Sequence, residues 1–369
     1  MKDYLKKYEV IIKTKGPVFV GDGKEIGKKE YVFLSDKSVG VFDIEKLYAE
    51  LKRRNRAAAF EKYMLENNRD NMNEWLAGQN INIADIRNTI KYELKSCDYI
   101  NRRAKGLQVM SFIKDAYGKP YIPGSSLKGM LRTILLAMDI MDNRGKYTRI
   151  ADGIDKILDP RNTARINRTQ LLKKEAGDLE TIVFRTLTRN ENKPGDAVND
   201  IMQGFIVSDS SPLSIDDLAL CQRIEVHKDG EEKSLPLLRE SIKPGTEIKF
   251  MLTIDSSVCQ YGEEDIIRGI KAFAQQYYDN FLVKFNKDRL SDNTVFLGGG
   301  PGFLSKTIIY PLFGEAGVGT TVNIFYKTGV GDKHKDDRRM KLSPHILKCT
   351  HYDGKLYQFG ECELILNRL

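Results

Sequence analysis

The chain has 369 residues, of which 41% are hydrophobic and 30% charged, with 17 Tyr and 16 Phe. This composition supplies enough apolar material for a sizeable core and excludes a wholly disordered chain, and the length predicts two domains or one domain with a large insertion. The 59 Lys and Arg exceed the 51 Asp and Glu by eight, and the meaning of such an excess depends on where it is concentrated.

β-strand patterns open the chain. Residues 8–15 (YEVIIKTK) are rich in β-branched residues and run into Gly16-Pro17, which predicts a strand closed by a turn. Residues 30–34 and 39–43 predict two short strands around a polar turn. The first residues carry no apolar leader or cleavage pattern, and no apolar run approaches the length that spans a bilayer, so we expect no membrane segment.

A helical insertion is expected at about residues 44–98. Long stretches without Gly or Pro carry helical spacing there, as in Leu47 and Leu51. A further helix is predicted behind the turn-forming YIPG, with Ser125 and Ser126 standing where an N-cap belongs. Its apolar residues follow a 3.6-residue repeat and predict one buried face: Leu127, Leu131, Ile134, Leu135 and Met138.

The second half of the chain alternates strand and helix patterns. Residues 143–199 are polar and basic and lead into the turn-rich ENKPGDAVND, which predicts a mobile excursion or loop. Beyond them a long amphipathic helix is predicted at residues 263–285. Strands are predicted at residues 204–210, 247–255, 294–297 and 307–311.

Because β and α elements alternate throughout, we expect an α+β fold of the ferredoxin-like (RRM-like) kind. The prediction is two tandem domains: residues 1–240, which include the helical insertion, and residues 241–369, which include a glycine-rich loop. Element spacing alone leaves open a single, heavily inserted unit.

The five cysteines are widely spaced and include no CxxC pair: Cys97, Cys221, Cys259, Cys349 and Cys362. This usage is typical of reduced thiols. We therefore expect a cytoplasmic protein without disulfides.

Basic residues concentrate between Lys95 and Arg132, where only Asp98 and Asp115 oppose them. The stretch is a candidate phosphate-binding surface. A solvated face of long cationic side chains is the alternative interpretation. The cations are Lys95, Arg102, Arg103, Lys105, Lys114, Lys119, Lys128 and Arg132.

Residues 121–132 (YIPGSSLKGMLR) combine a Pro-Gly turn, two hydroxyl residues and a helix start, whose free N–H groups and dipole favour an anion. Lys128 and Arg132 are spaced i, i+4 on one flank, and Gly129 removes bulk between them. The set suits an RNA backbone. An ordinary amphipathic helix with surface cations is the alternative interpretation.

Residues 296–307 (FLGGGPGFLSKT) place four glycines around Pro301, ahead of Ser305 and Lys306. Such glycines permit close approach of a ligand to the backbone, and a tight strand-to-strand turn is the alternative. The segment is not a P-loop, because Ser305 stands where Gly must precede Lys. It also lacks the third glycine of the Rossmann fingerprint, so nucleotide hydrolysis is not expected.

Together, the run from Pro123 to Gly129 and the loop from Gly298 to Gly302 resemble the RAMP superfamily of CRISPR-associated proteins, which bind guide RNA on ferredoxin-like folds. The opening YEVIIKTKGPVFVGDGKEIGKKEYVF and the closing PHILKCTHYDGKLYQFGECEL resemble the fifth-subunit family of the Csm complex of type III-A CRISPR-Cas systems. The helical insertion and residues 143–199 are the least distinctive parts.

The resemblance implies a non-catalytic, guide-RNA (crRNA) binding subunit for antiviral defence. It would cap the filament of backbone subunits near the guide's 3′ end and be needed for guide maturation. The implied partners are the crRNA, single-stranded target RNA, other Csm RAMP backbone subunits, small subunits and recruited host trimming ribonucleases; no cofactor is implied. The matching positions for guide contact are Ser125, Ser126, Lys128, Arg132, Gly298, Gly299, Gly300, Gly302 and Lys306.

The alternative function is a metal-independent RAMP endoribonuclease that processes repeat RNA with a histidine in proton transfer. The four histidines lie far in sequence from both glycine segments, and an isolated histidine is more often a surface or core residue than a general base. We therefore expect no catalytic residue among His227, His334, His345 and His351.

No metal site is expected either. His345, Cys349, His351 and Cys362 match no common zinc spacing. Asp336-Asp337 stands among four Lys and Arg residues, which weaken cation binding, so a solvated loop is the simpler interpretation.

Overall fold

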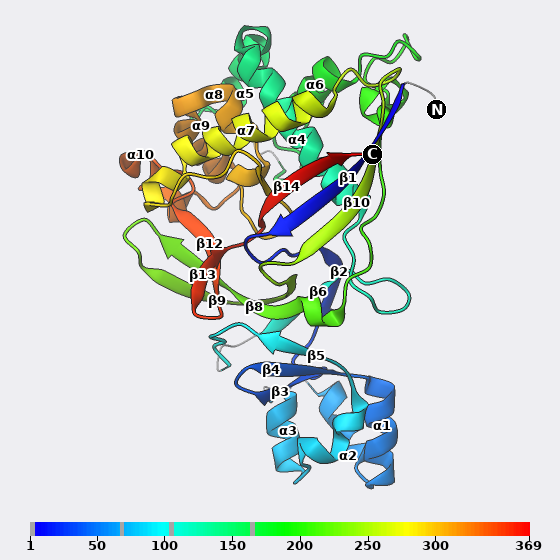
Figure 1. Cartoon of the computed structure of the whole chain (residues 1–369). Coiled ribbons are helices and arrows are strands. Elements are labelled where there is room, and N and C mark those ends of the chain that lie inside the picture. Colours follow the sequence, from blue (N-terminus) through cyan, green and yellow to red (C-terminus); the bar gives the residue numbers. More distant parts are fainter. Residues whose placement is uncertain (1–3, 67–69, 103–106, 163–166) are drawn as a thin grey trace.

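The computed structural model describes the chain apart from residues 1–3, 67–69, 103–106 and 163–166 (Figure 1). Its helices and strands are organised around two sheets, and a group of helices projects beyond the second sheet. Within these described parts, no helix combines the length and apolarity that crossing a membrane requires.

A five-stranded sheet joins the two ends of the chain. β1 (Leu5–Thr14) pairs antiparallel with β10 (Glu247–Asp255) on one side and with β14 (Glu361–Arg368) on the other. β7 (Phe205–Val207) and β11 (Thr294–Phe296) form its edges. Alternate residues of β1 and β10 are buried, as expected of strands with one face against a core.

Two long helices, α4 (Gly124–Asp142) and α7 (Glu263–Asn280), share the core on the buried face of this sheet. They approach so closely that a Cβ added to Gly269 would lie 3.1 Å from Ile134 Cγ2. The chain order β1-α4-β7-β10-α7-β14, with the strands arranged β14-β1-β10-β7, is the split βαβ pattern of a ferredoxin-like unit. The predicted α+β, ferredoxin-like fold is confirmed.

The second sheet runs in the order β2-β6-β9-β8-β5-β4-β3, and β12 pairs with both β8 and β13. β3 and β4, the two short strands predicted around a polar turn, pair antiparallel. The strands of this sheet are β2 (Gly21–Ile26), β3 (Tyr31–Ser35), β4 (Ser38–Phe42), β5 (Ile90–Ser96), β6 (Gln108–Phe112), β8 (Leu218–His227), β9 (Glu232–Ile242), β12 (Ile346–Tyr352) and β13 (Lys355–Gln358).

The predicted domain boundary between residues 240 and 241 falls inside β9. β1 lies in the same sheet as β10 and β14, whereas β12 and β13 join the sheet of β8 and β9. Each sheet therefore takes strands from both sides of this boundary.

The helical insertion is confirmed over residues 44–89. It contains α1 (Ile44–Arg53), α2 (Ala57–Leu65), α3 (Met72–Gly78) and the 3₁₀ segment η1 (Ile83–Thr89), which enclose a core of their own. The predicted end at residue 98 is wrong, because residues 90–96 form strand β5. Their apolar residues alternate with polar ones at a period of two.

The predicted mobile loop at residues 143–199 is wrong. It contains α5 (Thr148–Leu158) and α6 (Lys173–Phe184), which contribute buried residues to the main core. In α5 the buried Ile154 and Leu158 are spaced i, i+4. This apolar stripe is short and lies among polar residues, so the sequence pattern did not indicate a helix.

Two smaller predictions need correction near the carboxyl end. The predicted strand at residues 307–311 is helix α8 (Ile309–Phe313), and Pro311 fits because a helix's first turn needs no N–H from that residue. The predicted helix at 263–285 ends as α7 at Asn280, before the 3₁₀ segment η6 (Leu282–Phe285). α9 (Gly317–Lys327) follows α8.

Candidate nucleic-acid interface

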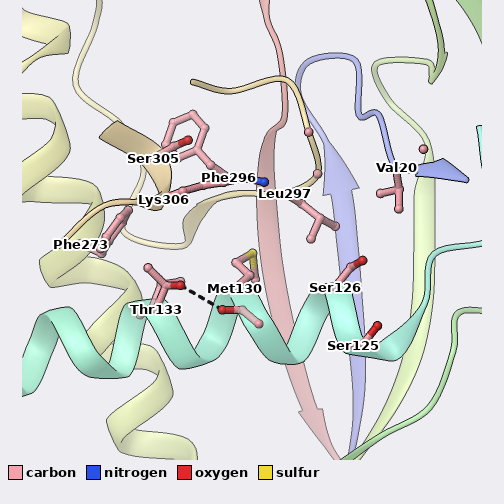
Figure 2. Close-up of a pocket in the computed structure, with 15 residues that line it drawn as sticks. Val20, Ser125, Ser126, Met130, Thr133, Phe273, Phe296, Leu297, Ser305 and Lys306 are labelled. Atoms are coloured by element: carbon pink, nitrogen blue, oxygen red, sulfur yellow. Dashed lines mark hydrogen bonds between the residues drawn. The ribbon is translucent and has the colours of Figure 1, made fainter. Parts of the chain in front are cut away.

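A cavity of about 490 Å³ lies between the first turns of α4 and the glycine loop that follows β11 (Figure 2). The fold thus brings together the two segments that the sequence singled out. Five of the predicted contact residues line this cavity: Ser125, Ser126, Gly298, Gly299 and Lys306. Their neighbours in the wall include Val20, Gly21, Gly129, Met130, Thr133, Leu297 and Ser305.

Backbone contacts set the start of α4. Gly124, its first residue, donates its N–H to Asp209 Oδ1 at 2.8 Å. A Cβ at this position would lie 2.4 Å from the carbonyl oxygen of Ser208, so the close approach requires glycine. The N-cap residue is Pro123, whose side chain makes no capping hydrogen bond. The predicted N-cap role of Ser125 and Ser126 is therefore wrong: both lie in the first turn, where their side chains stand beside the cavity (Figure 2).

The glycine loop is shaped by two phenylalanines of this chain. Gly298 has φ +81°, and a Cβ there would lie 2.3 Å from the carbonyl oxygen of Phe19. Gly299 donates its N–H to the same oxygen at 2.6 Å. A Cβ on Gly300 would lie 2.7 Å from Phe359 Cβ. Packing within the chain therefore explains these glycines, of which Gly298 and Gly299 line the cavity.

Lys306 reaches the cavity from the far end of the loop, on the 3₁₀ turn η7 (Leu304–Lys306). Burial lowers the pKa of its ammonium below the ordinary value. In the described parts of the chain no carboxylate lies within ion-pair distance of Lys306, so its charge is left for a ligand of the cavity.

Lys306 belongs to a cationic cluster, which we define as Arg223, Arg239, Lys306 and Lys348. Burial, reinforced by Arg223 and Arg239, lowers the pKa of Lys348 to about 8. Burial and Arg223 together lower the pKa of Arg239 to about 10.

Several side-chain nitrogens of this cluster also lack hydrogen-bond partners. Nε and Nη1 of Arg239 and Nε of Arg223 are buried without a hydrogen-bond partner. Glu225 pairs with Arg223 at 2.5 Å. Buried cations that lack counter-ions are costly, so the cluster suits a polyanion that supplies the missing negative charge.

Sequence reasoning missed Arg223, Arg239 and Lys348. They lie on β8, β9 and β12, none of which was predicted. β8 opens on the continuous apolar run LALC and β9 contains Pro236, so neither shows a regular period-two alternation. Only the pairing of β12 with β8, and of β8 with β9, brings the three cations together.

A family model described as the RAMP superfamily matches residues 11–304 of the chain. Curated relatives named CRISPR system Cms protein Csm5 align along most or all of it. The relative from Mycobacterium tuberculosis (strain H37Rv) is 30% identical over 395 residues and 100% of both chains. The relative from Streptococcus thermophilus is 28% identical over 84% of this chain and 82% of its own length. The chain belongs to the RAMP superfamily, in its Csm5 family.

Solved structures share the fold of this RAMP chain. A chain of a Csm–crRNA–target RNA ternary complex from a type III-A CRISPR-Cas system, seen by cryo-electron microscopy, has a TM-score of 0.59 and 19% identity. That match covers 97% of this chain and 100% of the other. The crystal structure of Csm5 from T. onnurineus has a TM-score of 0.60 and 19% identity over 96% of this chain and 99% of its own.

Lys128 and Arg132 of this RAMP chain lie outside the lining of the cavity. Nη2 of Arg132 lies 2.9 Å from Asp200 Oδ2 and 3.1 Å from Glu180 Oε2. The guanidinium also stands 4.3 Å over the ring of Phe184. Burial lowers the pKa of Lys128. Arg132 is thus engaged within the fold, and guide contact by these two residues stays a prediction.

The basic stretch between Lys95 and Arg132 is distributed over separate elements. Its residues come from β5, from the segments around β6 and from α4, and Arg103 and Lys105 lie outside the described residues. Four of its cations have carboxylate partners: Lys95 with Asp353, Arg102 with Asp36, Lys114 with Glu240, and Arg132 with Asp200.

A second cavity, of about 590 Å³, includes Gly302 at the end of the glycine loop. Arg223 and Lys348 of the cationic cluster line it, so the cluster extends from one cavity to the other. Three of the four histidines also line it, although the sequence places them far from the loop: His227, His334 and His345. The fourth, His351, lies 2.7 Å from Glu232 and lines neither cavity.

Proposed function

We propose that this chain binds crRNA as a non-catalytic subunit of a type III-A Csm complex. In that role it caps the filament of backbone subunits near the guide's 3′ end and is needed for guide maturation in the cytoplasm. Its proposed partners are the crRNA, single-stranded target RNA, the other Csm RAMP backbone subunits, the small subunits and host trimming ribonucleases.

The cationic cluster is the observation that supports this proposal most directly. Lys306 faces the first cavity, Arg223 and Lys348 face the second, and Glu225 pairs with Arg223. A strand of RNA that passed along the glycine loop would bring phosphates to both cavities and neutralise this buried charge.

The first cavity favours phosphate over bases. Ser125 and Ser126 offer hydroxyl donors at the start of a long helix, and Lys306 offers positive charge. Contacts of this kind position a nucleic acid without reading its sequence. We therefore expect strong salt dependence and slight sequence preference.

The relatives supply independent support. The curated ones are named as CRISPR system proteins, and one of the structures that share the fold belongs to a complex containing crRNA and target RNA. The shared fold is consistent with a role in binding crRNA. The residues proposed to contact the RNA are chosen from the cavities of this chain alone.

A metal-independent RAMP endoribonuclease is the second candidate. The histidines of the second cavity favour it, because His345 Nδ1 lies 2.6 Å from the carboxylate of Asp337, as in an oriented general base. Cleavage by transfer to the RNA's own 2′-hydroxyl needs a base and an acid on opposite sides of one phosphorus atom. His334 and His345 both turn Nδ1 toward the same carboxylate. We prefer binding without cleavage, because phosphate binding accounts for the buried, unpartnered nitrogens of Arg223 and Arg239 in the cationic cluster.

Titration of labelled single-stranded RNA at several salt concentrations tests the binding role. Replacing two cluster charges, in Lys306→Gln with Lys348→Gln, should weaken binding. It should also reduce the magnitude of the log–log salt slope by about 1.4, at about 0.7 for each lost phosphate contact on a single strand.

The matched control removes two exposed charges from the helical insertion, in Lys52→Gln with Lys62→Gln. Both double variants lower the net charge equally, so a general electrostatic effect would change them alike. Unchanged binding in the cluster variant, or equal weakening in both, would remove the cluster from the RNA site.

A further inference from the structure

Two imidazoles hold one fully buried carboxylate at the side of the second cavity. Nδ1 of His334 lies 3.0 Å from Oδ2 of Asp337, and Nδ1 of His345 lies 2.6 Å from Oδ1. The Asp337 side chain is 0% exposed, whereas both histidines also line the cavity. A ligand in the cavity can therefore reach the imidazoles that contact Asp337.

Local structure fixes this arrangement. His334 ends the 3₁₀ segment η9 (Gly331–His334), and Asp337 begins the short helix α10 (Asp337–Met340), so the two side chains are spaced i, i+3. His345 immediately precedes β12. His334, Asp337 and His345 place one nitrogen or oxygen atom each within 4.8 Å of the others.

When both histidines are neutral, neither of them balances the negative charge of the Asp337 carboxylate. In the described parts of the chain, Asp337 has no Lys or Arg within ion-pair distance, and the side chains that contact its carboxylate are His334, His345 and Ser343. A buried carboxylate with only neutral partners retains its full negative charge, which is costly unless a cation compensates it.

We propose that His334, Asp337 and His345 form a binding site for one divalent transition-metal ion of the zinc class. The ion would take Nδ1 of each imidazole and a carboxylate oxygen, with its fourth position open to the second cavity. Each neutral imidazole would then carry its proton on Nε2, and a proton displaced from a protonated imidazole would pass to solvent. The site goes beyond the RNA-binding role and does not depend on it.

The donor set selects the class of metal. Two nitrogen donors and one carboxylate suit zinc and its first-row neighbours, whereas Ca²⁺ and Mg²⁺ require mainly oxygen ligands. Arg223 and Lys348 line the same cavity and repel cations in general. An ion must therefore gain its affinity from direct bonds to nitrogen, which again favours zinc over Mg²⁺.

A bound ion would fasten the η9–α10 segment to the start of β12. β12 carries Lys348 of the cationic cluster and pairs with β8, so the ion would also fix one wall of the second cavity. The fourth histidine, His351, lies on the same strand but contacts Glu232 instead, and provides a matched control.

The test uses the full chain without a histidine tag, stripped with a chelator and dialysed against Zn²⁺. We expect about one ion per chain, and Co²⁺ as a substitute should show the visible absorption of a tetrahedral site. His334→Ala and His345→Ala should each weaken binding by at least about tenfold, while His351→Ala should bind as the unsubstituted chain does.

Asp337 is buried, so Asp337→Ala could fail to fold. Asp337→Asn keeps the shape of the side chain, and circular-dichroism melting shows whether each variant is folded. Absence of zinc binding by the folded, stripped chain would overturn the site, as would equal binding by the His345→Ala and His351→Ala variants. Stabilisation by inorganic phosphate without any by zinc would also overturn it. RNA titration with stripped protein tests the proposed function separately.

Discussion

The guanidinium of Arg132 lies 2.9 Å from the carboxylate of Asp200, whose other oxygen accepts the N–H of Met202 at 2.8 Å. Arg132 therefore connects α4 to the turn that precedes β7. Its side chain is 20% exposed, and a partly buried ion pair of this kind leaves an unpaired carboxylate when one partner is removed.

The first prediction is that Arg132→Ala lowers the free energy of unfolding by about 1–3 kcal/mol, the cost of a buried polar group left unsatisfied. Lys128→Ala, which breaks no such pair, should stay within about 0.5 kcal/mol. Urea unfolding beside RNA titration separates the roles. Weaker RNA binding by Arg132→Ala with unchanged unfolding would instead place this residue in the RNA site.

The second prediction concerns pH and Lys348. Because burial lowers the pKa of Lys348 to about 8, the folded chain loses this charge as the pH rises through that value. RNA binding should therefore weaken between pH 7 and pH 9. Lys348→Arg keeps its charge throughout this range and should reduce the pH dependence. The unsubstituted chain and Lys348→Arg are compared on the same RNA at fixed ionic strength. Titration of the RNA bases then affects both measurements equally. Equal pH profiles would count against Lys348.

The same shift affects stability with the opposite sign. Above pH 8 the unfolded chain still binds the proton of Lys348, up to its ordinary pKa of about 10.4, while the folded chain has released it. The free energy of unfolding therefore gains with rising pH over this window. The gain should be absent from Lys348→Gln in urea unfolding followed at each pH.

The local patterns of the sequence were enough to locate the cavity of the candidate site. The apolar stripe of α4 and the glycines after β11 are short-range signals, and they identified Ser125, Ser126, Gly298, Gly299 and Lys306, which line one cavity. The cap prediction failed because the fold, through Asp209 and the backbone of Ser208, starts the helix at Gly124.

The remaining residues depend on long-range pairing. Arg223 and Lys348 are far apart in sequence and come together only because β12 pairs with β8. His334 and Asp337 carry a local i, i+3 signal, but the neighbouring cations made a solvated loop the simpler interpretation. Burial of Asp337 beneath two imidazoles is a property of the tertiary structure.

The third prediction is that labelled repeat RNA stays intact when incubated with this chain, with or without Mg²⁺. The reason is that the cationic cluster accounts for phosphate binding, while Nδ1 of His334 and Nδ1 of His345 are both engaged by the one carboxylate of Asp337. Products with 2′,3′-cyclic phosphate ends that disappear in His345→Ala, but persist in His351→Ala, would establish the endoribonuclease in its place.

The fourth prediction uses two helical glycines to test the first cavity. Gly129 of α4 and Gly153 of α5 both have no atom within 4 Å of an added Cβ, and only Gly129 lines the cavity, where its carbonyl oxygen accepts a hydrogen bond from Thr133 (Figure 2). Alanine at either position should stabilise the fold by about 0.4–1 kcal/mol, because it reduces the freedom of the unfolded chain.

Their effects on RNA should differ. The methyl group of Gly129→Ala would occupy space beside Ser125 and Ser126 that a phosphate backbone needs, so this variant should bind RNA less tightly despite its greater stability. Gly153→Ala should bind as the unsubstituted chain does. Thermal melting and RNA titration of both variants decide the matter, because reduced stability cannot explain a loss of binding that accompanies a higher melting temperature. Equal RNA affinity in the two variants would show that the strand does not approach this face of α4.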